Sequence, residues 1–195
     1  MNRLLNIIVL SLIISSFSFA QNVKFGIKAG GNLAKFTNND DLEFKFGPHF
    51  GALANIAISD QFSLQPELLY SAQGYRQNFN GQKVRAKVDY FNLPFLASYE
   101  VTNGLILQAG PQIGINIRND LDVDGQEQGS IFVNDIDISA AFGFQYFIDE
   151  TIFTQLRGTI GISEVVSNLN DQRHFVLSLS LGLMLDKVEQ DEDLD

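Results

Sequence analysis

The chain has 195 residues, 13 Lys and Arg against 23 Asp and Glu, and no cysteine. Its length suits a single domain. The acidic balance offers no basic face to nucleic acid, and the absence of cysteine excludes disulfides as a source of stability. Sixteen glycines and 17 phenylalanines with only 4 prolines favour an all-β fold.

The first twenty residues have the pattern of a cleaved signal peptide. Arg3 gives a positive start, residues 4–19 are an apolar run, and small residues precede Gln21. The run is shorter than the roughly 20 residues that a membrane-spanning helix needs, so an uncleaved anchor is the weaker alternative. We therefore expect a signal peptide over 1–20, a folded domain over 21–185 and an acidic, solvated periplasmic tail over 186–195.

From Val23 onward, large apolar residues alternate with small or polar ones, and this period of two predicts β-strands. Pro94 weakens the fourth of them, because proline removes a ladder hydrogen bond. The expected strands span residues 23–33, 49–59, 62–75, 89–99, 105–117, 136–146, 154–162 and 173–185.

The connections between these strands alternate between long and short. The long ones are expected as polar loops, with Asn80-Gly81 as a tight turn in the second of them. The long loops cover 37–45, 76–87, 118–134 and 164–172. An even number of strands in this rhythm is typical of transmembrane barrels, whose short turns face the periplasm. The prediction is an all-β, eight-stranded antiparallel up-and-down barrel in the outer membrane, with both termini periplasmic.

The last strand shows which face of the barrel meets lipid. It carries an uninterrupted row of large side chains, namely Phe175, Leu177, Leu179, Leu181, Leu183 and Leu185. The opposite faces of the strands are built from Gly, Ser, Ala, Asn and Gln, which suit the crowded interior of a small barrel. We expect the apolar faces to point outward. A soluble carrier of lipocalin type, with the apolar face inward, is the remote alternative.

Four charged residues fall on the inward face, namely Lys28, Glu67, Asp137 and Arg157, among glutamines 65, 108, 112, 145 and 155. Buried charges persist when they are paired and hydrogen-bonded, so Glu67 is predicted to pair with Lys28 or Arg157. This polar network predicts a filled lumen that acts as a structural plug. The alternative is a gated path for ions or small solutes, lined by the same groups.

Several segments resemble the PorT-like outer-membrane β-barrel family, over nearly the whole of 23–185. They are LQPELLYSAQG (64–74), YFNLPFLASY (90–99), LQAGPQIG (107–114) and the closing FVLSLSLGLML. The resemblance implies an outer-membrane barrel, and some members of the family are implicated in protein secretion. It also implies outer-membrane lipids, the barrel-assembly machinery and possible secretion or envelope proteins as partners. The chain has no Trp, so an interfacial aromatic belt falls to phenylalanines and to Tyr70, Tyr75, Tyr90, Tyr99 and Tyr146.

The longest loop carries a weak calcium motif. Asp120, Asp122 and Asp124, followed by Gly125, give the D-x-D-x-D-G spacing of calcium loops. Ile131 stands where such a loop would supply its bidentate glutamate. A solvated acidic loop is therefore the alternative to calcium binding.

The loop after the third strand is basic, with Arg76, Lys83, Arg85 and Lys87 and no acidic residue between them. Facing outward, these side chains could bind lipopolysaccharide phosphates through charge-assisted hydrogen bonds. The alternative is that they only solvate the loop or pair with the acidic residues of 120–127.

The pattern offers no catalytic residues. His174 and Ser178 share a strand face but stand about 13 Å apart, too far for a base and its nucleophile. His49 stands by itself near a loop end. We therefore expect no enzyme and no cofactor, but a structural, adhesion, assembly or secretion-associated barrel, with a binding protein that uses its extracellular loops as the alternative.

Overall fold

The computed structural model describes residues 23–37, 43–79, 81–131, 133–163 and 173–185. These residues form nine antiparallel strands: β1 (Val23–Phe36), β2 (Glu43–Ala57), β3 (Phe62–Phe79), β4 (Gln82–Thr102), β5 (Leu105–Val123), β6 (Gln126–Ser130), β7 (Ile136–Phe147), β8 (Ile152–Gly161) and β9 (His174–Leu185). The predicted signal peptide, the acidic tail and the loop 164–172 lie outside the described residues.

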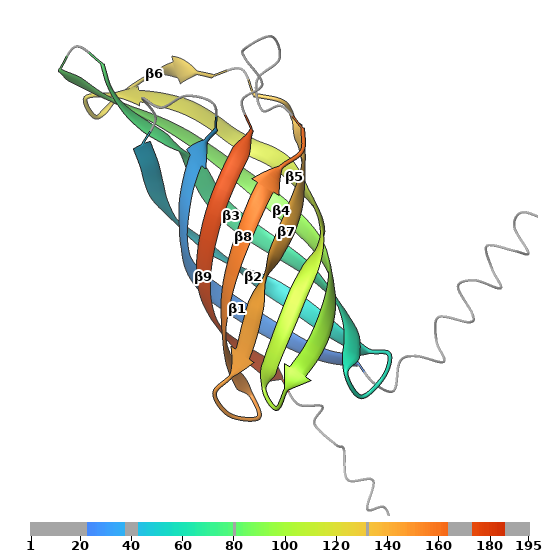
Figure 1. Cartoon of the computed structure of the whole chain (residues 1–195). Coiled ribbons are helices and arrows are strands. Elements are labelled where there is room, and N and C mark those ends of the chain that lie inside the picture. Colours follow the sequence, from blue (N-terminus) through green and yellow to red (C-terminus); the bar gives the residue numbers. More distant parts are fainter. Residues whose placement is uncertain (1–22, 38–42, 80, 132, 164–172, 186–195) are drawn as a thin grey trace, which may run out of the picture.

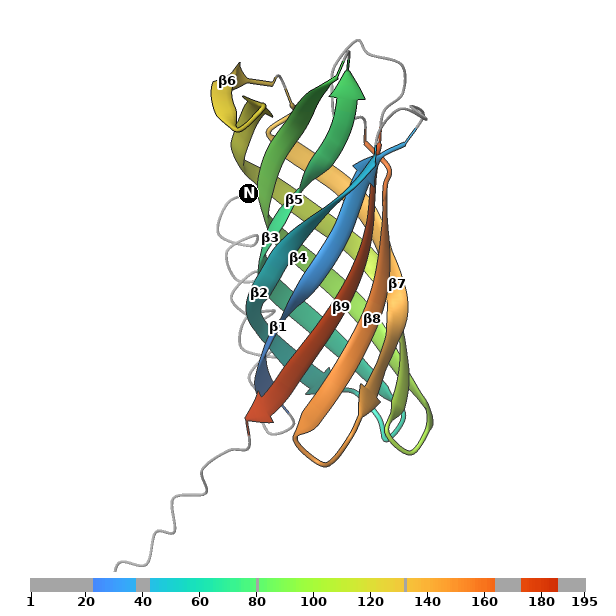
Figure 2. The same ribbon diagram turned by 90° about the vertical axis from the view of Figure 1, so that its left-hand side faces the viewer.

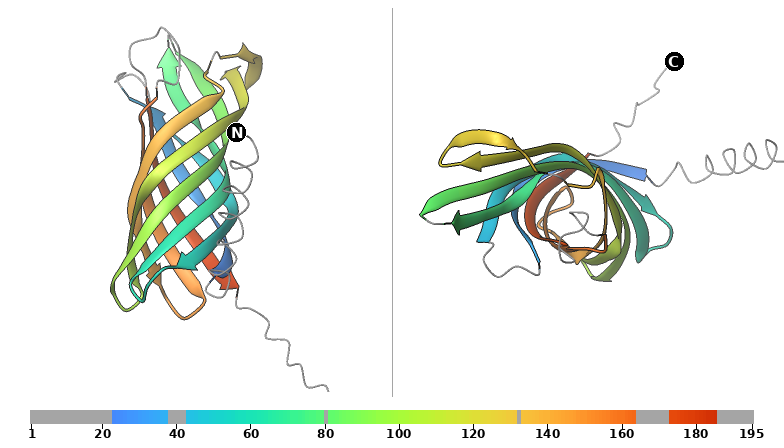
Figure 3. Two further views of the ribbon diagram at one scale, coloured as in Figure 1. Left: turned by 90° about the vertical axis from the view of Figure 1, so that its right-hand side faces the viewer. Right: turned by 90° about the horizontal axis from the view of Figure 1, so that it is seen from above.

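Eight of the strands close into a ring in the order β1-β2-β3-β4-β5-β7-β8-β9 (Figure 1). The first and last strands complete it by pairing from Phe25 opposite Leu185 to Phe36 opposite His174. Seen from above, the strands surround a central lumen (Figure 3). The expected eight-stranded up-and-down barrel is therefore confirmed.

The strands are longer than the alternating pattern indicated, because β3, β4 and β5 continue beyond the ring as a sheet (Figure 2). Much of the expected loop 76–87 is a hairpin in which Phe79 pairs with Gln82, and Gly81 has a positive φ of 83°. The expected loop 118–134 contains the end of β5 and all of β6. These two loop predictions, and the loop assignment of residues 43–45, were wrong because charged side chains hide the apolar alternation there.

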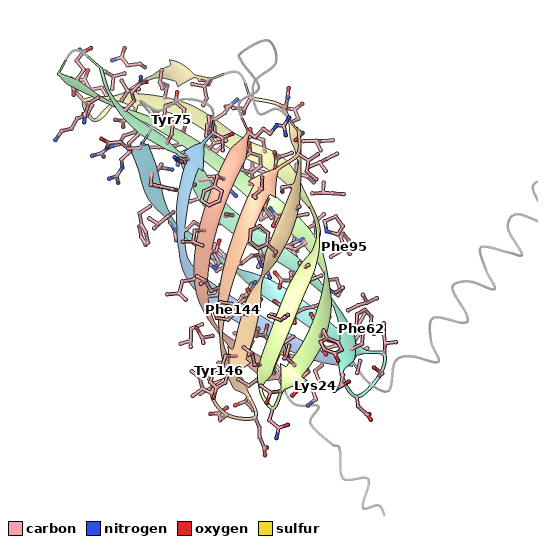
Figure 4. The ribbon with its side chains drawn as sticks, viewed as in Figure 1. Lys24, Phe62, Tyr75, Phe95, Phe144 and Tyr146 are labelled. Carbon is pink, nitrogen blue, oxygen red and sulfur yellow. The ribbon has the colours of Figure 1, made fainter. Side chains whose placement is uncertain are left out.

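The apolar side chains face outward. Phe25 is 60% exposed, Leu179 is 59% exposed and Phe95 projects from the wall in Figure 4, whereas Gln65 is fully buried inside. Such an apolar outer belt suits lipid and would be costly in water. The predicted orientation is confirmed, and the soluble-carrier alternative is wrong. The strand β4 also runs through Pro94, which stands opposite Gln112 of β5.

Short connections gather at one end of the barrel, which we call the short-turn end. They are residues 58–61, 103–104 and 148–151, and β1 begins and β9 ends there as well (Figure 1). The opposite end, with the extended sheet, is the long-loop end. In the turn between β7 and β8, Asp149 Oδ1 accepts hydrogen bonds from the N–H groups of Ile152 (2.6 Å) and Thr151 (2.8 Å).

These hydrogen bonds make the turn sensitive to pH. The Ile152 and Thr151 N–H groups hold the pKa of Asp149 below its ordinary value of 3.8. A lowered pKa means that the carboxylate stabilises the folded state above pH 3.8 and that this contribution is lost as pH falls through the folded-state pKa. We expect Asp149→Asn to lower the unfolding midpoint at pH 7, and the difference from the wild type to vanish at strongly acidic pH. Thermal unfolding across pH measures this, and an offset independent of pH would contradict it.

Candidate functional site

A buried ion triad occupies the lumen between the two ends. The carboxylate of Glu67 on β3 accepts hydrogen bonds from Arg157 Nη1 and Nη2 on β8, both at 2.7 Å, and from Lys28 Nζ on β1 at 2.8 Å. The three residues are 4% exposed. The sequence suggested one partner for Glu67, and the structure gives it both. A bidentate guanidinium and an ammonium on one carboxylate fix the positions of three strands across the lumen.

Glutamine side chains give Lys28 and Glu67 further hydrogen bonds. Lys28 Nζ donates to Gln155 Oε1 (2.6 Å), and Gln65 Nε2 donates to Glu67 Oε1 (2.8 Å). Gln155 Nε2 in turn donates to Gln108 Oε1 (2.6 Å). Because hydrogen bonds offset the cost of burying charges, these glutamines support the triad, although Gln65 Oε1 has no hydrogen-bond partner among the described residues.

Apolar side chains close the lumen at both ends. At the short-turn end, Phe153 packs with Leu53 and Met184. Gly182 makes room for this packing, since a Cβ at that position would overlap the Phe153 ring. At the long-loop end, the buried residues Phe36, Ala86, Val88 and Tyr90 pack together, with Tyr75, Ile131 and Val133 against them.

The polar middle of the lumen retains a cavity of about 20 Å³, lined by Lys28, Arg157, His49 and their neighbours. That is room for about one water molecule. The described part of the barrel therefore has the geometry of a plug and not of an open pore.

Asp137 does not belong to the triad. Its Oδ1 accepts a hydrogen bond from Ser163 Oγ at 3.2 Å, on the β7–β8 side of the wall near the long-loop end. The structure thus brings Lys28, Glu67 and Arg157 together and leaves Asp137 apart. The sequence could not separate them, because all four occur at inward positions of their strands.

Charged side chains cover the sheet that extends beyond the ring. Across it, Glu43 stands opposite Arg76, Arg76 opposite Arg85, and Arg85 opposite Asp122. The ion pairs are Lys87 with Asp122 (3.2 Å) and Arg118 with both Asp120 and Glu127. The hydrogen bond from Arg118 also holds the pKa of Asp120 below its ordinary value.

The three aspartates of the calcium motif do not converge. Asp120 binds Arg118, Asp122 binds Lys87 and the Gly125 N–H, and Asp124 accepts from the Lys83 N–H at 2.9 Å. Among the residues that the structure describes, no three His, Cys, Asp or Glu side chains gather as a metal ion would require. The motif instead forms the turn between β5 and β6, in which Asp124 and Gly125 have φ values of 51° and 87°.

The sequence comparison identifies the fold family. Residues 19–167 match the protein family described as the outer membrane protein beta-barrel domain. The chain belongs to this family. Membership indicates the outer membrane as its location. The described residues contain no helix long and apolar enough to span a bilayer.

Solved structures share the fold of this outer-membrane β-barrel at low identity. Neisserial surface protein A is 13% identical, with 83% of this chain and 96% of that chain covered and a TM-score of 0.54. The attachment invasion locus protein Ail of Yersinia pestis, solved with the heparin analogue sucrose octasulfate, is 12% identical, with 84% and 97% covered and a TM-score of 0.50. No curated protein matches the chain by sequence.

Sequence reasoning missed the histidine contacts of this outer-membrane β-barrel. His49 is not isolated: its Nε2 lies 2.7 Å from Ser180 Oγ inside the lumen. His174 Nε2 lies 2.9 Å from the hydroxyl of Tyr90. The histidine–serine pair resembles a base with a nucleophile, but a cavity that holds about one water has no room for a substrate. Both contacts join side chains across the lumen. The alternation in the sequence shows that each of these residues points inward, but it does not show which residue on another strand it meets.

The aromatic belt is smaller than expected. Tyr99 and Tyr146 are each 48% exposed, and Tyr146 lies near the short-turn end in Figure 4. Tyr90 is buried in the lumen and Tyr75 packs edge-on against Phe36, so neither serves the belt. Exposed phenylalanines, among them Phe44 and Phe46, take their place toward the long-loop end.

Proposed function

We propose that this protein is a non-conducting outer-membrane barrel that serves as a membrane-anchored platform for envelope assembly or secretion. The observation that carries this proposal is the closed lumen, with an ion triad between two apolar plugs. A barrel that cannot pass solutes acts through its surfaces, and the sheet formed by the ends of β3, β4 and β5 with β6 extends beyond the ring of strands.

The orientation follows from the usual topology of such barrels, in which short turns face the periplasm. The extended sheet then faces the outside of the cell, and the described termini of the barrel face the periplasm. The resemblance of 64–74 and 90–99 to PorT-like proteins supports a role in secretion, because some of those proteins are implicated in it. Expected partners are outer-membrane lipids, the assembly machinery during insertion, and envelope or secretion proteins.

The closed lumen gives a direct electrical prediction. The purified full barrel in planar lipid bilayers is expected to show no steady unitary current above the bilayer baseline, because the cavity beside Lys28 and Arg157 holds about one water. Single-channel recording measures this. A large, steady conductance would overturn the plug and favour the channel alternative.

The platform role is tested by shortening the extended sheet. In one variant, residues 76–85 are replaced by an Asn-Gly turn between Tyr75 and Ala86, which stand opposite each other. Proteins that co-purify with the wild type from outer membranes should be lost with this variant. Heat-modifiable gel migration checks that its barrel still assembles, and an unchanged set of co-purified proteins would contradict the proposal.

A further inference from the structure

Two arginines stand directly opposite each other on the extended sheet. Arg76 on β3 and Arg85 on β4 are paired in the β3–β4 ladder, and both are exposed. Side chains in such a pair leave Cβ atoms about 5 Å apart, and like charges in this position repel. No ion pair to either arginine forms among the described residues, although Glu43 and Asp122 flank the pair in the ladders. An anion between the two guanidinium groups would remove the repulsion.

A third cation belongs to the same cluster. Lys83 lies two residues from Arg85 on β4, and therefore on the same face of the sheet. Arg76, Lys83 and Arg85, which we call the basic cluster, border a hollow of about 160 Å³ together with Glu43, Gln77, Asn78 and Val84. Three cations face one carboxylate in this hollow, so it attracts anions.

The other cations of the sheet differ from the basic cluster in being neutralised already. Lys87 pairs with Asp122 at 3.2 Å, and Arg118 binds Asp120 and Glu127. The four-residue basic loop predicted from sequence thus divides into one ion-paired lysine and three cations that form no close ion pair among the described residues. Arg85 interacts with Asp122 only at longer range, because Asp122 is paired with Lys87. The unpaired charge is concentrated at the basic cluster.

The cluster lies at the upper limit of the apolar belt. Glu43 stands opposite Arg76, and the next residue, Phe44, stands opposite Tyr75. Successive residues of a strand point to opposite faces, so Phe44 shows the height of the cluster along the barrel and not its face. The cluster lies on the outer face, because Ala86, the residue after Arg85, is buried against the lumen plug. Phe44 is 43% exposed, its ring contacts Phe175, and Lys35 Nζ lies 5.0 Å above it. An aromatic residue beside a cation is typical of the boundary between acyl chains and headgroups. An anion held by Arg76 and Arg85 is therefore at headgroup level.

We propose that Arg76, Lys83 and Arg85 form a binding site for the phosphate of a phosphorylated glycolipid in the outer leaflet. A phosphate can accept paired N–H bonds from each planar guanidinium, while Lys83 adds a point charge. The lipid's acyl chains would enter the bilayer beside the apolar outer wall below the basic cluster. Lipid binding at this site does not depend on whether the lumen conducts. It can be refuted without refuting the platform role, and the platform role can be refuted without refuting it.

Binding of lipid A to the full barrel in detergent micelles tests the site, measured by native mass spectrometry. Arg76→Gln/Arg85→Gln is expected to weaken binding about tenfold or more, since it removes both guanidinium groups that would donate to the phosphate. Lys87→Gln, which removes an already paired cation of the same strand, should change it less than twofold. Equal loss in both variants, or in neither, overturns the proposal.

Further measurements distinguish a phosphorylated lipid from other anionic ligands. Dephosphorylated lipid A should bind the wild type as weakly as phosphorylated lipid A binds the double variant. If inorganic phosphate displaces lipid A at equal concentration, the site takes small anions and the lipid assignment is wrong. If an acidic protein from outer membranes occupies the cluster in place of lipid, the assignment is wrong as well.

Reversing the charge of Arg85 tests lipid binding in a variant whose stability is measured separately. Arg85→Glu places a carboxylate opposite Arg76, where a cross-strand ion pair replaces one repulsion, and also opposite Asp122, where it creates another. Because the two changes oppose each other, the thermal midpoint should stay close to that of the wild type while lipid A binding is lost. A variant that keeps its stability and still binds lipid A would refute the site.

Discussion

Replacing Glu67 by Gln is expected to destabilise the barrel by about 3–5 kcal/mol, the usual cost of removing one partner from a buried ion pair. The variant keeps the shape of the side chain but leaves Lys28 and Arg157 without a counter-charge inside the lumen. Both cations donate to the lost carboxylate at 2.7–2.8 Å, and all three residues are buried. Denaturant unfolding in lipid vesicles, followed by tyrosine fluorescence because the chain has no Trp, measures the loss.

Two comparisons show whether the loss comes from the unpaired charges. Asp60→Asn, an exposed carboxylate in the β2–β3 turn, should change stability by less than about 0.5 kcal/mol. Replacing Lys28, Glu67 and Arg157 together by Met should recover most of the stability, because apolar side chains of similar volume often substitute for a buried ion cluster. If the triple variant is as unstable as Glu67→Gln, the charges are not the cause.

The sequence predicts the barrel wall well because the wall has only two environments, lipid and lumen. Leu179 and Gln65 therefore differ in hydropathy as sharply as they differ in exposure. The same rule fails where the outer face carries charges in place of apolar side chains. Lys83, Arg85 and Lys87 occupy the outer face of β4 there, while the alternating Ala86 and Val88 are buried against the lumen plug. With the large apolar row replaced by charges, the stretch has the composition of a loop. The outer ends of β3, β4 and β5 were therefore assigned to loops.

The contents of the lumen could be predicted only as a set of inward residues. Lys28, Glu67 and Arg157 come from β1, β3 and β8, no two of which are neighbours in the ring. Their meeting depends on the stagger of the strands around the barrel, which the alternation of a single strand does not encode. The same stagger places Asp137 near Ser163 and away from the triad, and brings His49 to Ser180.

The second large loss of stability is expected from placing a charge on the outward face of β9. Replacing Leu179 by Arg is expected to cost about 2–4 kcal/mol, the cost of an arginine on the lipid face at the bilayer midplane. Leu179 lies in the middle of β9 and is 59% exposed, with Leu181 beside it at the same exposure. Unfolding in lipid vesicles measures the change, and its origin is the transfer of a guanidinium into hydrocarbon.

Comparing the cost of an arginine at two positions of β9 shows whether the loss of stability comes from contact with lipid or from damage to the strand. Leu185 shares the outward face of β9 but ends it at the short-turn end, where the bilayer interface is expected. Leu185→Arg should therefore cost only about 0–1 kcal/mol, because the penalty falls toward the interface. Equal costs at the two positions would mean that β9 does not cross a hydrocarbon layer, and the assignment of this wall to the membrane would fail with it.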